Sequence, residues 1–146
     1  MSRENVELVR RLLDLFAKGE HEAVFVLYDP EIEWDATNHA ALVDDLSGIY
    51  RGHEGVRTYW RQWLQAWRDI EFEVEDVRDA GDEVVALIRN QRQWGRRSGI
   101  VTEMPPYGLV FTIRGGKVVR WCAYPDHRSA LEAVGLSEQD AHADSP

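Results

Sequence analysis

The first half of the chain carries apolar residues at helical spacing, interrupted by one short alternating segment. Across residues 2–18 they recur every three or four positions, which predicts a helix, and a shorter helix is predicted for 20–28. Ile32 and Trp34 then alternate with acidic residues, which predicts a strand followed by a surface loop. A third helix is predicted from His53. Its apolar stripe consists of Val56, Trp60, Trp63, Leu64 and Trp67.

From Ile70 onward the apolar period changes to two, which is typical of strands. The predicted strands run from Ile70 to a turn at Ala80, then over 83–94, 100–114 and 117–124. Pro105-Pro106 interrupts the third strand, Gly115-Gly116 forms a hairpin turn, and a short helix over 128–134 closes the pattern. Helices therefore come early and hairpins late, which predicts an α+β domain over residues 1–136 and a polar, frayed tail over 137–146.

Composition narrows the class of protein. The 146 residues are 44% hydrophobic and 29% charged, which fits one globular domain. A net charge of −9 argues against nucleic acid and against an anionic membrane surface as partners. Cys122 is the single cysteine, and with no signal peptide or long apolar run the chain is expected to be cytoplasmic. The five His residues do not stand at ligand spacing, so no metal and no cofactor is expected.

The order of elements resembles the ketosteroid-isomerase-like, or nuclear-transport-factor-two-like, superfamily and its SnoaL-like proteins. The stretches that carry the resemblance are NVELVRRLLDLFAKGE, VLYDPEIEWDA, YRGHEGVRTYWRQW, DAGDEVVAL, RGGKVVRW and SALEAVGL. The resemblance implies a cone: a strongly curved antiparallel sheet wrapped by three N-terminal helices around an apolar pocket. It also implies a homodimer formed across the open face of the sheet.

Asp35 is the sharpest candidate for chemistry. In ketosteroid isomerases an aspartate at the matching place is the general base, and burial in an apolar pocket would raise its pKa. That reaction also needs an oxyanion hole, whose two positions fall at Leu12 and Leu109 in this chain. Both residues are apolar, so the resemblance does not extend to steroid isomerisation.

Two further activities of the superfamily are weighed on other residues. Limonene-epoxide-hydrolase-like members hold an arginine between two aspartates. Here Arg89 and Gln91 are expected on one face of the long strand, and the second aspartate position falls near Ala123, so that triad is absent. SnoaL-like polyketide cyclases need an acid/base group, for which Asp35 and His39 are available, whereas Asp126 is expected to cap the last helix.

The resemblance and the alternation together define an expected site. The expected catalytic residues are Asp35, His39 and Arg89. The expected substrate-binding residues are Trp34, Tyr59, Trp60, Gln91, Tyr107, Phe111 and Trp121. Two functions stay open: a cofactor-independent isomerase, cyclase or hydrolase acting on a small apolar molecule, or a non-catalytic module of the same fold that binds a small ligand or dimerises.

Overall fold

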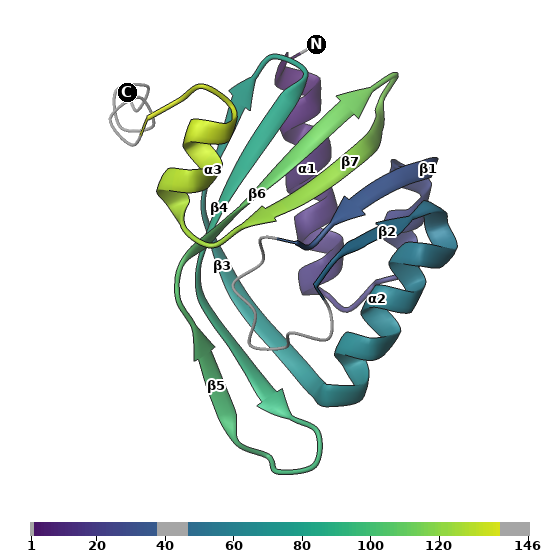
Figure 1. Ribbon diagram of the computed structural model, residues 1–146, viewed down its shortest axis with the longest axis vertical. Helices are drawn as coiled ribbons and strands as arrows, with labels where there is room; N and C mark the ends of the chain where they lie inside the picture. Colours follow the sequence, from purple (N-terminus) through teal and green to yellow (C-terminus); the bar gives the residue numbers. More distant parts are fainter. Residues whose placement is uncertain (1, 38–46, 138–146) are drawn as a thin grey trace.

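One curved sheet carries the fold, with α1 and α2 against its inner face and α3 against its outer face (Figure 1). This computed structural model describes residues 2–37 and 47–137. The helices are α1 (Ser2–Ala17), the 3₁₀ helix η1 (Ala23–Leu27), α2 (Gly52–Ala66) and α3 (His127–Ala133). The strands are β1 (Tyr28–Asp35), β2 (Ile49–Arg51), β3 (Trp67–Ala80), β4 (Glu83–Gly95), β5 (Val101–Met104), β6 (Tyr107–Arg114) and β7 (Lys117–Tyr124).

The predicted α+β cone is confirmed, with one difference in the sheet. Within the described residues the strand order is β2-β1-β7-β6-β4-β3, and β5 also pairs with β4. All pairs are antiparallel except β1 with β7, which run parallel. That register sets Trp34 beside Trp121 on the inner face, where their rings stack at 3.9 Å. The sheet is therefore mixed. The two parallel strands are far apart in the sequence, with α2 and the hairpins between them.

Several boundaries differ from the prediction. The second helix is the short η1, and β1 begins at Tyr28, so Pro30 lies inside a strand. The β1–β7 register shifts between Tyr28 and Glu33, which leaves room for a residue without a backbone N–H. The segment predicted as a loop contains β2. Residues 138–146, most of the predicted tail, lie outside the described part. No helix in the described segments combines the length and the apolar character that crossing a membrane requires.

Apolar residues are buried on both faces of the sheet. The main core lies between the inner face and helices α1 and α2. A smaller core lies under α3 on the outer face and consists of Val85, Leu87, Val110, Ala130 and Leu131. Asp126 caps α3 as predicted, accepting a 2.7 Å hydrogen bond from the Ser129 N–H. Gly108 permits the close approach of this helix, since a Cβ at that position would lie 2.3 Å from the Cβ of Ala130.

A β-bulge in β4 reverses which residues face inward. The β3–β4 register shifts opposite Asn90, which has a φ of 52°, a conformation that Asn tolerates better than most residues. Before the bulge Ile88 faces the core, and after it Gln91 does, while Arg89 is exposed. The prediction that Arg89 and Gln91 share one face is therefore wrong, because simple alternation fails where one strand carries an extra residue.

Candidate functional site

A cavity of about 50 Å³ lies between the inner face of the sheet and helices α1 and α2. The helices line it with Leu12, Leu13, Phe16, Tyr59, Trp60 and Trp63. The strands add Ile70, Phe72, Ile88, Leu109, Phe111 and Trp121. Leu12 and Leu109, the apolar residues at the oxyanion-hole positions of the isomerases, thus both lie on its wall. Close-packed interiors contain few voids larger than a water molecule, so this cavity is an unusual feature of the core.

Six of the seven expected substrate-binding residues line this cavity: Tyr59, Trp60, Gln91, Tyr107, Phe111 and Trp121. Trp34 does not. It lies behind Trp121, fully buried, with the two ring planes only 6° apart. Trp34 therefore supports the wall of the cavity from behind, although the alternation along its strand predicted that it would line the cavity.

The mouth of the cavity lies between α1, α2 and β3. Of the lining residues, only Phe16, Trp60, Ile70 and Phe72 are half-buried, whereas the others are buried. The Phe16 ring contacts Trp60 at 4.7 Å and Phe72 at 6.1 Å between centroids. His21 packs on Phe16 at 4.7 Å, and burial lowers the pKa of its imidazole. The position of this histidine could not be predicted, because His21 follows α1 in a turn without periodicity.

The polar groups of the cavity are concentrated at one end. The Tyr107 hydroxyl donates a short hydrogen bond to Oε1 of Gln91. Nε2 of Gln91 donates to Oε1 of Gln93 at 3.0 Å and to Sδ of Met104 at 3.1 Å. Gln91, Gln93 and Met104 are all buried. Neither Gln93 nor Met104 had been singled out from the sequence, since an isolated Gln or Met in a strand carries no distinctive pattern.

Among the described residues, the ionisable groups on the wall are the phenols of Tyr59 and Tyr107. Burial raises the pKa of Tyr107, and burial together with the nearby Tyr107 and Tyr50 raises the pKa of Tyr59. Both phenols are therefore neutral at ordinary pH. No carboxylate or imidazole within residues 2–37 and 47–137 lines the cavity. The described wall can hold a small apolar molecule and one polar group, but it supplies no base.

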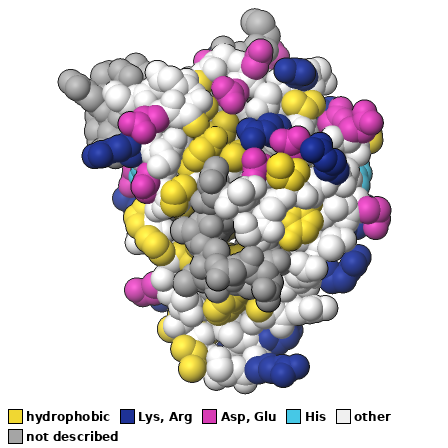
Figure 2. All heavy atoms as spheres, viewed as in Figure 1, with side chains coloured by type: hydrophobic (Ala, Val, Ile, Leu, Met, Phe, Trp, Pro, Cys, Tyr) yellow, Lys and Arg dark blue, Asp and Glu magenta, His cyan; other side chains and the backbone are white. Residues whose placement is uncertain are grey.

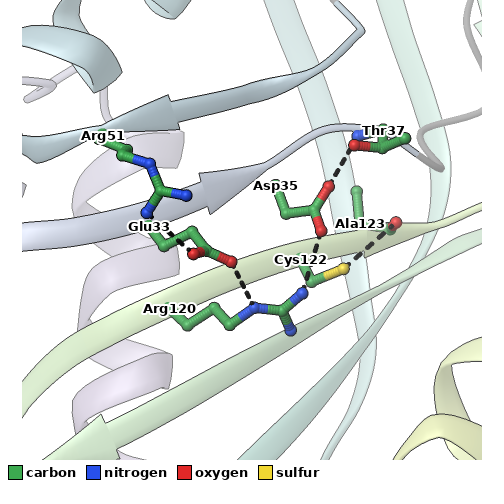
Figure 3. A network of polar contacts seen from close by, with 7 residues as sticks. All are labelled: Glu33, Asp35, Thr37, Arg51, Arg120, Cys122 and Ala123. Atoms are coloured by element: carbon green, nitrogen blue, oxygen red, sulfur yellow. Dashed lines mark hydrogen bonds and ion pairs between the residues drawn. The ribbon is translucent and has the colours of Figure 1, made fainter.

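Asp35 lies on the opposite side of β1, in an ion-pair network (Figure 3). Its carboxylate accepts from the Thr37 N–H and from Arg120, both at 3.0 Å. Arg120 also binds Glu33 at 3.0 Å, and Glu33 binds Arg51 at 3.2 Å. Burial raises the pKa of Asp35, but the bonds from Thr37 and Arg120 outweigh it, so the pKa lies below its usual value. The expected raised pKa in an apolar pocket is therefore wrong.

This network belongs to a charged patch at the β1, β2 and β7 end of the outer face. Figure 2 shows basic and acidic side chains interleaved over that end of the view. Alternation along β1 explains the placement: Trp34 faces the core, so Glu33 and Asp35 on either side of it face outward. The carboxylate is held ionised by a cation, which is the arrangement of a structural ion pair.

Arg89, another expected catalytic residue, does not lie beside Asp35. Arg89 is half-exposed on the outer side and pairs with Glu73 at 3.3 Å and Glu75 at 3.4 Å. Its strand, β4, is separated from β1 by β6 and β7. The cation beside Asp35 is Arg120, which was not among the site residues predicted from the sequence. His39 lies outside the described residues. In the described parts of the chain, no three His, Cys, Asp or Glu side chains come together as metal ligands do.

The amino-acid sequence that forms this fold matches a known domain family. The SnoaL-like domain matches residues 9–121, from within α1 to the cavity-lining Trp121 of β7. The chain belongs to the SnoaL-like domain family. No protein of curated function matches this chain significantly.

Solved structures share the fold of this SnoaL-like domain at low sequence identity. An NTF2-like protein of unknown function from Burkholderia pseudomallei K96243 has a TM-score of 0.74 at 18% identity, over 93% of this chain and 100% of that chain. TerC, co-crystallised with polyporic acid, has a TM-score of 0.72 at 18% identity, over 90% and 98%. A candidate SnoaL-like polyketide cyclase from Jannaschia sp. CCS1 has a TM-score of 0.70 at 21% identity, over 100% and 96%. Such identities establish the fold alone.

Proposed function

We propose that this SnoaL-like domain binds a small, largely apolar molecule in the cavity between the sheet and helices α1 and α2. The observation that carries the proposal is the cavity itself, with its aromatic wall and one polar end. Ligand sites are typically apolar hollows with a few convergent polar groups. TerC, a neighbour in fold, was crystallised with polyporic acid, which supports an organic ligand for this fold.

The size of the cavity limits the ligand. A volume of about 50 Å³ accommodates only a few non-hydrogen atoms while the mouth keeps its present form. A larger molecule would have to displace the half-buried rings of Phe16 and Phe72, which lie at the mouth. Rings with one partly exposed edge are displaced at lower cost than those inside the core, so the mouth between α1, α2 and β3 is the expected entry.

Filling the cavity tests the proposal. Leu109→Phe places a ring into the cavity, and the neighbours of Leu109 across the sheet are the small residues Ala86 and Ala123, which leave room for it. We expect the wild type to bind furan, pyrrole or toluene saturably, followed by tryptophan fluorescence and by ligand NMR, and Leu109→Phe to lose that binding. Val26→Phe, at an exposed position, is the matched control and should bind like the wild type. The proposal fails if the wild type binds none of the three probes.

A second candidate function is cofactor-independent isomerase, cyclase or hydrolase chemistry. The observation in its favour is the neutral phenol of Tyr59 on the wall, since such a group can donate to a carbonyl that becomes an enolate. Asp35 and Arg89 face away from the cavity, so His39 would have to supply the base. Exchange of the α-hydrogens of cyclopentanone in D₂O, measured by NMR, should then exceed the buffer rate and fall in Tyr59→Phe and in His39→Ala. A rate equal to that of buffer eliminates this candidate for that substrate.

The assembly and the location of the protein complete the proposal. We expect a homodimer across the outer face of the sheet, where Arg120 and Tyr124 of β7 are half-buried. Cys122, which lies between these two residues on β7, is buried. Light scattering should give twice the 16.8 kDa chain mass, and a monomer mass at micromolar concentration would contradict the dimer. One buried cysteine fits a reducing compartment, and a cytoplasmic location is proposed on that basis.

A further inference from the structure

Aromatic rings from three elements close the mouth of the cavity. Phe16 comes from the last turn of α1, Trp60 from α2 and Phe72 from β3, and all three are half-buried on the wall. Trp60 is anchored in the core, since its ring contacts the buried Tyr59 at 4.9 Å between centroids. The ring neighbours of Phe16 within the described residues are themselves half-buried. Phe16 is therefore held in place by rings at the surface.

His21 joins the ring from α1 to the ring from α2. Its imidazole lies 4.7 Å from Phe16 and 6.5 Å from Trp60 between centroids, with its plane 18° from that of Trp60. Phe16 and Trp60 are 4.7 Å apart, so the three rings form a closed triangle. His21 itself does not line the cavity. It contacts two residues of the wall without being part of the wall.

The end of α1 fixes the position of His21. Gly19 has a φ of 79°, and its N–H donates to the Phe16 carbonyl at 3.0 Å. The Glu20 N–H donates to the Leu15 carbonyl at 3.0 Å, which completes the turn that ends the helix. His21 follows directly and returns to the helical turn that carries Phe16. Its position relative to Phe16 is therefore set within a few residues of chain and does not depend on the sheet.

The contact between His21 and Phe16 opposes opening of the mouth. Burial lowers the pKa of His21, so at neutral pH the imidazole is uncharged and packs as an aromatic ring. One aromatic pair favours the packed arrangement by about two- to tenfold. Phe16 must leave its contacts with His21 and Trp60 to swing away from the mouth, so each contact reduces the open fraction.

We infer that His21 sets the upper size limit of the ligand by holding Phe16 over the mouth. This inference rests on the proposed binding function and assigns its size selectivity to a positioning residue. A molecule that fits the closed cavity of about 50 Å³ binds without moving Phe16. A larger one binds only where Phe16 has swung away, so its apparent affinity is reduced by the open fraction. His21 therefore weakens the binding of large ligands and leaves small ones unaffected.

Furan and naphthalene test the inference, because both are flat and neither donates a hydrogen bond. Naphthalene has about twice as many non-hydrogen atoms as furan and exceeds the closed cavity. We expect His21→Ala to bind naphthalene about fivefold more tightly than the wild type and furan with unchanged affinity, measured by titration of the tryptophan indole signals in NMR spectra. If furan binds but naphthalene binds equally to both proteins, or to neither, the inference is overturned and the proposed function stands. If the wild type binds none of furan, pyrrole and toluene, the proposed function fails and the inference fails with it.

Two variants assign the effect to the ring of His21. His21→Phe keeps an uncharged ring against Phe16 and Trp60, so it should bind naphthalene like the wild type. His53→Ala removes an imidazole that contacts Phe25 at 5.2 Å, away from the cavity wall, and should leave both affinities unchanged. A gain in naphthalene affinity in either variant, or an equal gain for furan in His21→Ala, contradicts the role given to His21. Circular dichroism of all three variants establishes that they are folded.

Discussion

Replacing Asp35 by Asn removes one negative charge from the outer network while keeping the shape of the side chain. The Asn oxygen can still accept from the Thr37 N–H, but its NH₂ group would face the Arg120 guanidinium, which in the wild type donates a 3.0 Å hydrogen bond to the carboxylate. Hydrogen bonds to charged groups contribute about 1.5–3 kcal/mol. The Arg120 side chain is 36% exposed and keeps Glu33 as a partner. The free energy of unfolding should therefore fall by about 1–2 kcal/mol in Asp35→Asn.

The stability lost in Asp35→Asn should depend on pH, and it should be greatest where Asp35 is ionised. The folded-state pKa of Asp35 lies below the ordinary 3.8, so its contribution to stability is fully present above pH 3.8 and is lost as pH falls through the lower, folded-state pKa. Urea unfolding at pH 7 should therefore show the full difference between wild type and Asp35→Asn, together with a melting temperature lower by about 3–6 °C. The two proteins should converge in strong acid, provided that both still fold there.

Asp29→Asn is the matched control. Asp29 also accepts a backbone hydrogen bond, from the Glu31 N–H at 2.8 Å, but at an exposed site, and its replacement should change stability by less than about 0.5 kcal/mol. The reasoning is refuted if Asp35→Asn is as stable as the wild type or more stable at pH 7. An inward-facing Asp35, as the sequence had suggested, would have given that result.

Two further substitutions probe the core on either side of the sheet. Tyr107→Phe leaves the buried Oε1 of Gln91 without its donor and should lower the free energy of unfolding by about 1–3 kcal/mol, so an unchanged urea midpoint would show that the bond contributes nothing. Gly108→Ala sets a Cβ 2.3 Å from the Cβ of Ala130. This contact must push α3 away and should lower the free energy of unfolding by about 1–3 kcal/mol. Hydrogen exchange should be faster in α3 of this variant, and unaltered protection there would be the contrary result.

Local periodicity in the sequence was sufficient to predict most residues of the cavity wall on β6 and α2. Tyr107, Leu109 and Phe111 alternate along β6 and all line the cavity, and the helical stripe of α2 brings Trp60 and Trp63 to the same place. Alternation in a strand and the 3.6-residue turn of a helix are properties of neighbouring residues. They fix which side chains share a face before any tertiary contact is known.

The errors arose where the answer depends on contacts distant in the chain. Arg120, which holds the charge of Asp35, is 85 residues away from it, and only the parallel β1–β7 register brings the two together. The bulge at Asn90 has no reliable local signal either, and it turns Gln91 inward, away from the face that carries Arg89. Met104 comes to Gln91 only through the β4–β5 pairing. Each error thus concerns which strands pair and in what register.

The parallel pairing of β1 with β7 also governs the order in which the chain can assemble. Strands β3 to β7 pair with neighbours close in sequence, so they can form a meander early. β1 and β2 cannot complete their side of the sheet until β7, which ends at Tyr124, has been synthesised. A nascent chain that has not yet reached Lys117 therefore carries the tryptophan-rich face of α2 without the full sheet against which it packs. Slow elongation over the last hairpin would prolong the interval in which that face can aggregate.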